Sequence, residues 1–106
     1  MIVHTLIYRF PASATEGDQE EFFTAMKELL DRNPLVKGFD YRPHLWLPAD
    51  ERSRGITASK IAQFTTETLE DLKTFSEIPE VYDFTTQWKQ KLRFEAAYAN
   101  HEPLSV

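Results

Sequence analysis

The first segment of the chain has the pattern of a β-strand. Its sequence, IVHTLIYRF over Ile2–Phe10, is rich in β-branched and aromatic side chains, which favour extended backbone. Neither of its two alternating faces is wholly polar, so we expect other parts of the protein to cover both. Pro11 then ends the strand.

Apolar residues at helical spacing predict a first helix after this strand. Thr15-Glu16-Gly17-Asp18 resembles a capping box, with Asp in place of the usual Glu or Gln. The helix should end before Asn33-Pro34, because the residue ahead of a proline disfavours helical backbone. The apolar face of the predicted helix consists of Phe22, Phe23, Met26, Leu29 and Leu30.

A second helical region follows later in the chain. Thr68-Leu69-Glu70-Asp71 is another start of the capping-box kind, and Leu72, Phe75 and Ile78 continue the pattern. Pro79 suits the first turn of a further helix. The apolar side of that helix would be Val81, Tyr82, Phe84, Trp88 and Leu92.

Three further runs favour extended backbone, at residues 36–47, 57–65 and 94–100. Pro43 in the first of them indicates a break or an edge position. Residues 48–55 form a polar loop, and residues 101–106 are predicted as a tail. The element order is therefore β-α-β-β-α-β.

This order predicts a ferredoxin-like α+β fold in one domain over residues 1–106. One four-stranded antiparallel sheet would carry both helices on one face and leave the other face bare. From strand parity we expect the bare face to be rich in aromatic residues, which a monomer would not leave in water. Two sheets packed face to face would then form a homodimer, a dimeric α/β barrel with an internal cavity. The residues expected on this face are His4, Leu6, Tyr8, Phe10, Phe64 and either Tyr41 or Phe39.

Length, charge and cysteine content narrow the range of functions that the protein could have. A chain of 106 residues fits one domain. The net charge of −5 argues against duplex nucleic acid as a partner. The sequence has no cysteine, which excludes disulfides, thiolate metal sites and a cysteine nucleophile. We see no targeting segment and no apolar run long enough for a membrane span, so a cytoplasmic protein without a membrane partner is expected.

Several segments, in their order and spacing, resemble the stress-responsive dimeric α/β-barrel (Dabb) family. The matching pieces are IVHTLIYRF, DQEEFFTAMKELL, a Gly-Ile-Thr followed by IAQF, and the Leu-Glu-Asp-Leu helix start. In Ile78–Val81, Ile-Pro-Glu-Val stands where the family often has His-Pro-x-His. The resemblance implies a ferredoxin-like homodimer. Most members have no settled activity, so it implies little about chemistry.

One branch of this family, olivetolic acid cyclase, closes a polyketide chain without a cofactor, and its machinery does not carry over. The tyrosine position falls on Phe75 and the histidine position on Val81. A further histidine position falls on Ala58, and the aspartate of the last strand falls on Ala99. Only His4 matches. Since Phe and Val cannot perform acid–base chemistry, we do not expect the cyclase mechanism.

His4 and Lys60 are the candidates for catalysis. On neighbouring strands they could face one cavity, where a buried lysine has a lowered pKa and could act as a base or bind an anion. The alternatives are that Lys60 pairs with an acid such as Glu95 or reaches solvent, and that His4 is a hydrogen-bonded core residue. His44 and His101 are too scattered for a zinc site, so no metal is expected.

For ligand binding, the aromatic and polar candidates are His4, Tyr8, Tyr41, Lys60 and Phe75. The alternative for the aromatic residues is packing in a dimer. The three glycines stand apart, which excludes a nucleotide-binding loop, and no cofactor is predicted.

Two main hypotheses for function follow. The first is a homodimeric barrel protein of undetermined activity that holds a small apolar or aromatic ligand. The second is a cofactor-free enzyme, of monooxygenase, isomerase or cyclase type, acting on a small aromatic or polyketide-like substrate. His4 would then be the general acid or base, and Lys60 or Tyr41 would stabilise negative charge. The family resemblance alone also implies a third role, a structural one in stress tolerance.

Overall fold

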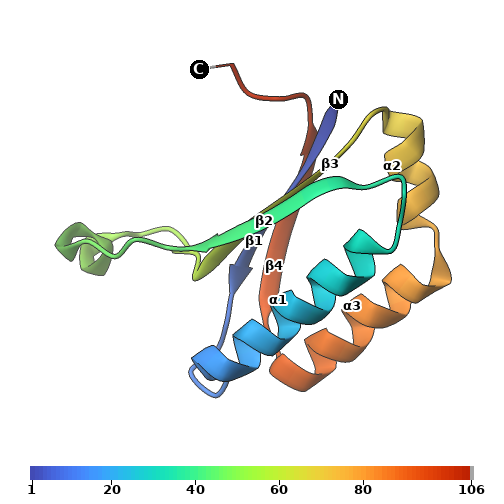
Figure 1. Cartoon of the computed structure of the whole chain (residues 1–106). Coiled ribbons are helices and arrows are strands. Elements are labelled where there is room, and N and C mark those ends of the chain that lie inside the picture. The colour runs from blue at the N-terminus through green and yellow to red at the C-terminus, as the bar shows by residue number, and fades with distance from the viewer. Residues whose placement is uncertain (106) are drawn as a thin grey trace.

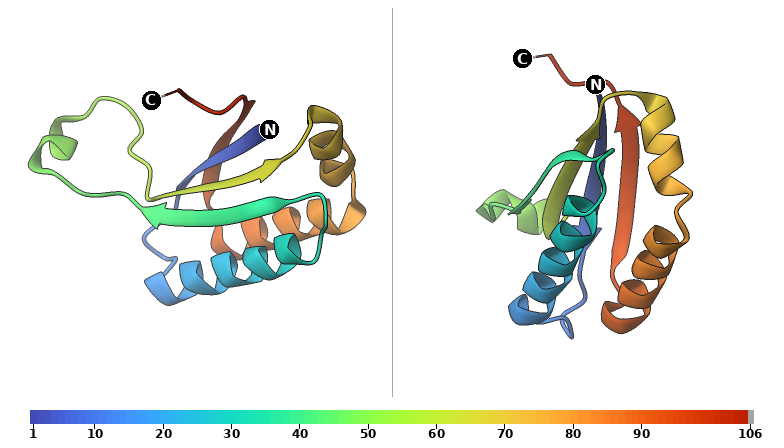
Figure 2. Two further views of the ribbon diagram at one scale, coloured as in Figure 1. Left: turned by 45° about the horizontal axis from the view of Figure 1, so that its top comes forward. Right: turned by 45° about the vertical axis from the view of Figure 1, so that its right-hand side comes forward.

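The computed structural model describes residues 1–105 and contains a single antiparallel sheet with three helices (Figure 1). The strand order in the sheet is β2-β3-β1-β4, and the helices pack on one of its faces (Figures 1 and 2). The predicted α+β ferredoxin-like fold is thus confirmed. In chain order the elements are β1 (Ile2–Arg9), α1 (Glu16–Asp31), β2 (Lys37–Pro43), a 3-10 turn (Pro48–Arg52), β3 (Lys60–Thr66), α2 (Leu69–Ser76), α3 (Pro79–Leu92) and β4 (Glu95–His101).

The helices begin where the sequence predicts. The Thr15 hydroxyl accepts a hydrogen bond from the Asp18 backbone N–H at 3.1 Å, and the Asp18 carboxylate accepts one from the Thr15 N–H at 3.0 Å. This is the predicted capping box. Thr68 caps α2 by accepting from the Asp71 N–H. Ile78 is extended ahead of Pro79, which separates α2 from α3.

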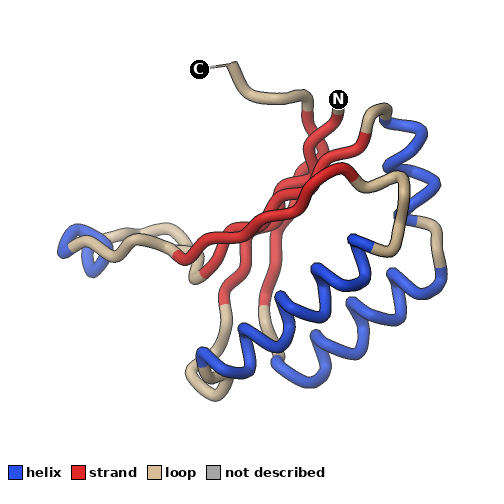
Figure 3. The backbone as a smooth tube through the Cα atoms, viewed as in Figure 1, coloured by secondary structure: helices blue, strands red, loops and turns tan. Residues whose placement is uncertain are grey.

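Two extended runs are shorter than predicted, and the fourth strand is longer at its end. β2 ends at Pro43 rather than Leu47, and β3 begins at Lys60. His101, which we expected in a tail, is the last residue of β4 and pairs with Val3. Its side chain accounts for this, because Nε2 bonds the Thr5 hydroxyl at 2.7 Å. The first and last strands run side by side, as the red segments that lead to the two ends of the chain show in Figure 3.

The aromatic residues lie on the helix-covered face of the sheet, not on the bare face. Tyr8 is 3% exposed and makes edge-to-face contacts with Phe22 and Phe23 of α1 and with Phe94. His4 lies opposite Phe64 in register and therefore shares this face. The predicted face assignment is thus wrong for the whole set of His4, Leu6, Tyr8, Phe10, Phe39, Tyr41 and Phe64. Parity shows which residues share a face, but it does not show which face the helices cover.

The bare face carries smaller and more polar side chains. Ile7 and Ile61 lie opposite each other in register and are 42% and 41% exposed. The Arg9 guanidinium bonds the Glu95 carboxylate at 2.6 Å near them. The apolar surface that could support a dimer on this face is therefore the isoleucine pair and not an aromatic patch.

The connection from β2 to β3 extends away from the body of the protein (Figures 1 and 2). His44 Nε2 and the Asp50 carboxylate are 2.8 Å apart at its base. Four apolar side chains of this connection are exposed, and all of them flank the predicted polar loop over residues 48–55: Leu45, Trp46, Leu47 and Ile56. Over residues 1–105, no helix combines the length and the apolar character needed to cross a membrane.

Candidate functional site

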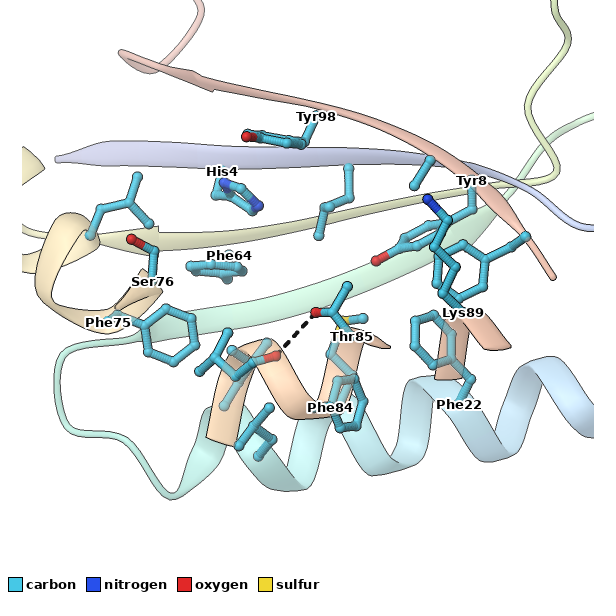
Figure 4. Close-up of a pocket in the computed structure, with 18 residues that line it drawn as sticks. His4, Tyr8, Phe22, Phe64, Phe75, Ser76, Phe84, Thr85, Lys89 and Tyr98 are labelled. Carbon is cyan, nitrogen blue, oxygen red and sulfur yellow. Dashed lines mark hydrogen bonds between the residues drawn. The ribbon is translucent and has the colours of Figure 1, made fainter. Parts of the chain in front are cut away.

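A cavity of about 280 Å³ lies between the sheet and the helices (Figure 4). It is bounded by β1, β3 and β4 on the sheet side and by all three helices on the other side. Phe75 of α2 and Val81 of α3 line it, so two positions that carry polar groups in the cyclase branch are apolar here. Most of its surface is apolar, with contributions from Leu6, Phe22, Met26, Phe64, Leu72 and Phe84.

His4 supplies an imidazole to this cavity, and its neighbours determine its tautomer and its protonation. Its Nδ1 donates a hydrogen bond to Asn100 Oδ1 at 2.6 Å, which leaves Nε2 as the nitrogen with a free lone pair. The ring lies 4.7 Å from the Phe64 ring and 5.3 Å from the Tyr98 ring, measured between centroids. Burial lowers the pKa of His4, and the nearby His101 lowers it further, against the raising effect of the Asn100 bond. His4 is therefore a neutral base at pH 7.

Tyr8 supplies a second polar group. Its side chain is almost fully buried, and burial raises the pKa of its hydroxyl above the ordinary value. Within the described chain, residues 1–105, that hydroxyl has no hydrogen-bond partner, and in Figure 4 it is directed toward the middle of the cavity. A buried hydroxyl usually has a partner, so Tyr8 is available as a neutral donor to a ligand.

Among the described residues that line the cavity, the other polar side chains are that of Tyr98 of β4 and three from α2 and α3. The Ser76 hydroxyl donates to the Lys73 carbonyl at 2.9 Å, and the Thr85 hydroxyl donates to the Val81 carbonyl at 3.1 Å (Figure 4). Both donors are thus already used within their own helices. Lys89 of α3 also lines the cavity.

Lys60 and Tyr41 do not belong to this cavity. Lys60 Nζ lies 3.0 Å from the Glu16 carboxylate, and the Tyr41 hydroxyl donates to Glu20 at 2.8 Å. Both line a separate depression between α1 and the start of the β2–β3 connection. The structure therefore brings together His4, Tyr8 and Phe75 and separates them from Lys60 and Tyr41. Lys60 thus pairs with an acid, as one of the alternatives has it, but the acid is Glu16. Glu95, the example given, is on the bare face with Arg9.

Sequence reasoning missed Asn100, Tyr98 and Lys89. Asn100 and Tyr98 follow from the register of β4, since they lie opposite His4 and Leu6 of β1. A correct alignment of the first and last strands would have found them. Nothing in the sequence indicated that Lys89 lines the cavity, because lysines are common near the end of a helix. In the part of the chain that the structure describes, no three His, Asp or Glu side chains cluster in a way that could hold a metal ion.

Fold and site together define a ferredoxin-like α+β protein with an internal, mostly apolar cavity. No family model matches the sequence, and no curated protein matches it either. Solved structures do match: At3g17210 of Arabidopsis thaliana has a TM-score of 0.82 at 18% identity, covering 100% of this chain and 98% of that one. The hydroxynitrile lyase of Passiflora edulis has a TM-score of 0.81 at 15% identity, covering 99% and 94%.

A Dabb family protein of Mesorhizobium loti, described as having a ferredoxin-like fold, has a TM-score of 0.74 at 13% identity. That match covers 98% of this chain and 97% of the other. Two other matched structures are described as dimeric proteins of unknown function. At these identities the comparisons establish the fold. The resemblance to the Dabb family that the sequence indicates is thus confirmed at the level of the fold.

Proposed function

We propose that this protein binds a small, largely apolar molecule in the cavity between its sheet and its helices. The observation that carries this proposal is an apolar cavity lined by a neutral imidazole, that of His4, and by the free hydroxyl of Tyr8. Ligand pockets are typically apolar with a few polar groups that orient the ligand. The volume of about 280 Å³ lies near the lower end of the usual range, which favours a small ligand.

A second candidate function is cofactor-free catalysis with His4 as the general base. The hydrogen bond to Asn100 favours it, because it holds the imidazole in one tautomer with Nε2 free to accept a proton. A hydroxynitrile lyase, an enzyme, has the same fold, which supports a catalytic use of this fold. Lys60 and Tyr41 line the other depression and take no part in this proposal.

We also propose a homodimer formed through the bare face of the sheet, in the cytoplasm. Ile7 and Ile61 support it as a partly exposed apolar pair on the two central strands of that face. The dimeric proteins that share this fold support it further. An apolar ligand and a dimer do not compete for the same surface, since they use opposite faces of the sheet.

Binding of the neutral fluorescent probe N-phenyl-1-naphthylamine tests the ligand proposal. Ala96 lies opposite Tyr8 and lines the cavity, so Ala96→Phe should fill part of it and weaken probe binding at least tenfold. Ala49→Phe, in the β2–β3 connection, makes the same change away from the cavity and should leave binding unchanged. Absence of probe binding to the unmodified protein, or equal binding by the Ala96→Phe variant, would overturn the proposal.

A further inference from the structure

The polar groups of the cavity lie at two separate ends. His4 and Tyr8 are four positions apart on β1, which corresponds to about 13 Å of strand. Asn100 of β4 lies opposite His4, and Ala96, near the start of β4, lies opposite Tyr8. Because α3 leads directly into β4, the last turns of α3 are near the Tyr8 end. Figure 4 places Lys89 at that end and His4 at the other.

Among the residues of 1–105 that line this cavity, Lys89 is the one formally charged side chain, and none of them is acidic. None of the ion pairs formed within residues 1–105 includes Lys89. Lys91, on the same helix, differs from Lys89 because its ammonium already has partners. Its Nζ lies 4.7 Å from the centre of the Trp88 ring and 4.0 Å from the Glu21 carboxylate.

We propose that the cavity takes a monoanionic and otherwise apolar ligand, an alkyl or aryl carboxylate, whose carboxylate is bound by Lys89 and the Tyr8 hydroxyl. This inference rests on the proposed ligand-binding function and names the ligand class. An ammonium and a neutral hydroxyl are complementary to one carboxylate, and charge-assisted hydrogen bonds of this kind are strong. A second negative charge on the ligand would find no further cation among the described residues that line the cavity, and an unpaired charge in a largely apolar cavity is costly.

The same geometry sets the orientation of the ligand. With the carboxylate beside Lys89, the apolar body extends past Phe64 and Leu72 and its far end reaches His4. A proton accepted by His4 Nε2 would then come from the end of the ligand opposite to its carboxylate.

A simpler role for Lys89 is to stabilise the end of α3. Lys89 and Lys91 both lie in the last turn, where cations interact favourably with the helix dipole. That role predicts equal effects for the two lysines on stability and no effect of either on ligand choice. The carboxylate proposal predicts that only Lys89 determines ligand choice.

Calorimetric titration with octanoate and with octan-1-ol, at low ionic strength, separates these possibilities. The unmodified protein should bind octanoate at least tenfold more tightly than octan-1-ol. Lys89→Gln should abolish this preference and leave octan-1-ol binding intact, whereas the matched control Lys91→Gln should keep the preference. Lys89→Glu should weaken octanoate further and favour octylammonium, and circular dichroism checks the fold of each variant.

Two results would overturn the inference and leave the proposed function standing. One is equal affinity of the unmodified protein for octanoate and octan-1-ol. The other is an equal loss of preference in the Lys89→Gln and Lys91→Gln variants. If neither octanoate, octan-1-ol nor the neutral naphthylamine probe binds, the proposed function itself is wrong, and the inference is wrong with it.

Discussion

Asn100 Oδ1 accepts a 2.6 Å hydrogen bond from His4 Nδ1, across the register of the two strands that carry them. The first and last strands of the chain thus fix the tautomer of the imidazole in the cavity. A neutral imidazole carries its proton on one of two nitrogens, and the partner of the protonated nitrogen decides which nitrogen is free to accept a proton.

Replacing Asn100 with Asp should raise the pKa of His4. A carboxylate beside an imidazole favours the charged form, against the burial that now lowers this pKa. Imidazole NMR resonances followed against pH measure the change. The resonances of His44, which pairs with Asp50 in the β2–β3 connection, serve as the internal reference and should be the same in both proteins. An unchanged His4 titration would show that the two side chains are not bonded in solution.

The protonation of His4 should also make folding less stable in mild acid. Its pKa in the folded protein is lowered from the ordinary value of 6.5. As the pH falls through 6.5, the unfolded chain therefore takes up the proton first, and stability declines. This contribution is fully present above that pH and is lost below it.

The matching measurement is urea unfolding at pH 7.5 and pH 5 for the unmodified protein and for His4→Gln. The variant should lose less stability between the two pH values, because every other titrating group is shared. An equal or larger loss in the variant would contradict the lowered pKa.

Phe23 should be among the most sensitive positions of the core. It is fully buried, and its ring stacks on Tyr41 with centroids 4.4 Å apart. Phe23→Ala leaves a cavity and should cost about 3–5 kcal/mol of unfolding free energy. Tyr82→Ala, at a site 71% exposed, should change it by about 0.5 kcal/mol or less. Denaturant unfolding compares the two, and similar costs would argue against the packing described.

Ile61→Asp should convert the proposed dimer to a monomer. The substitution puts a charge on a central strand of the bare face, opposite Ile7, where a paired sheet would bury it. Light scattering coupled to gel filtration at micromolar concentration measures the mass. Tyr82→Asp adds the same charge on the exposed side of α3 and should leave a dimer. A monomeric unmodified protein would refute the dimer at once.

Arg93→Gly should stabilise the protein. Arg93 ends α3 with φ of 56°, a left-handed backbone that costs a residue with a side chain about 1–2 kcal/mol. Glycine removes most of that cost, so the gain should be about 0.5–1 kcal/mol. Arg93→Ala keeps the strain and should give no gain in thermal unfolding. A gain from both variants would mean that the arginine side chain, not the backbone, is unfavourable.

Local signals in the sequence were sufficient to predict the helices and strands. They were not sufficient to predict which face of the sheet the helices cover. Thr15 and Thr68 begin helices through short-range hydrogen bonds, and Pro79 separates two helices through its own ring. Whether His4 and Tyr8 face the helices or the bare side depends on how the helices pack across the sheet, which strand parity does not encode. The larger side chains fill the space beneath the helices.

Predicting which residues meet in the site requires knowledge of contacts between residues far apart in the chain, and a single sequence does not give these contacts. Lys60 bonds Glu16, which is 44 positions away, and His4 bonds Asn100, which is 96 positions away. His4 was found because of its place in the first strand. Asn100 was missed because no local pattern distinguishes it from other polar residues near the end of the chain.

The side of the sheet on which the cavity lies also determines how many ligands each chain binds. The cavity lies between the helices and the helix-covered face of the sheet, and the proposed dimer contact is on the opposite face. Each protomer therefore holds a complete site, and we expect titrations to saturate at one ligand per chain whether the protein is monomeric or dimeric. Occupancy of one site would not change the lining of the other, so the binding curve should be hyperbolic.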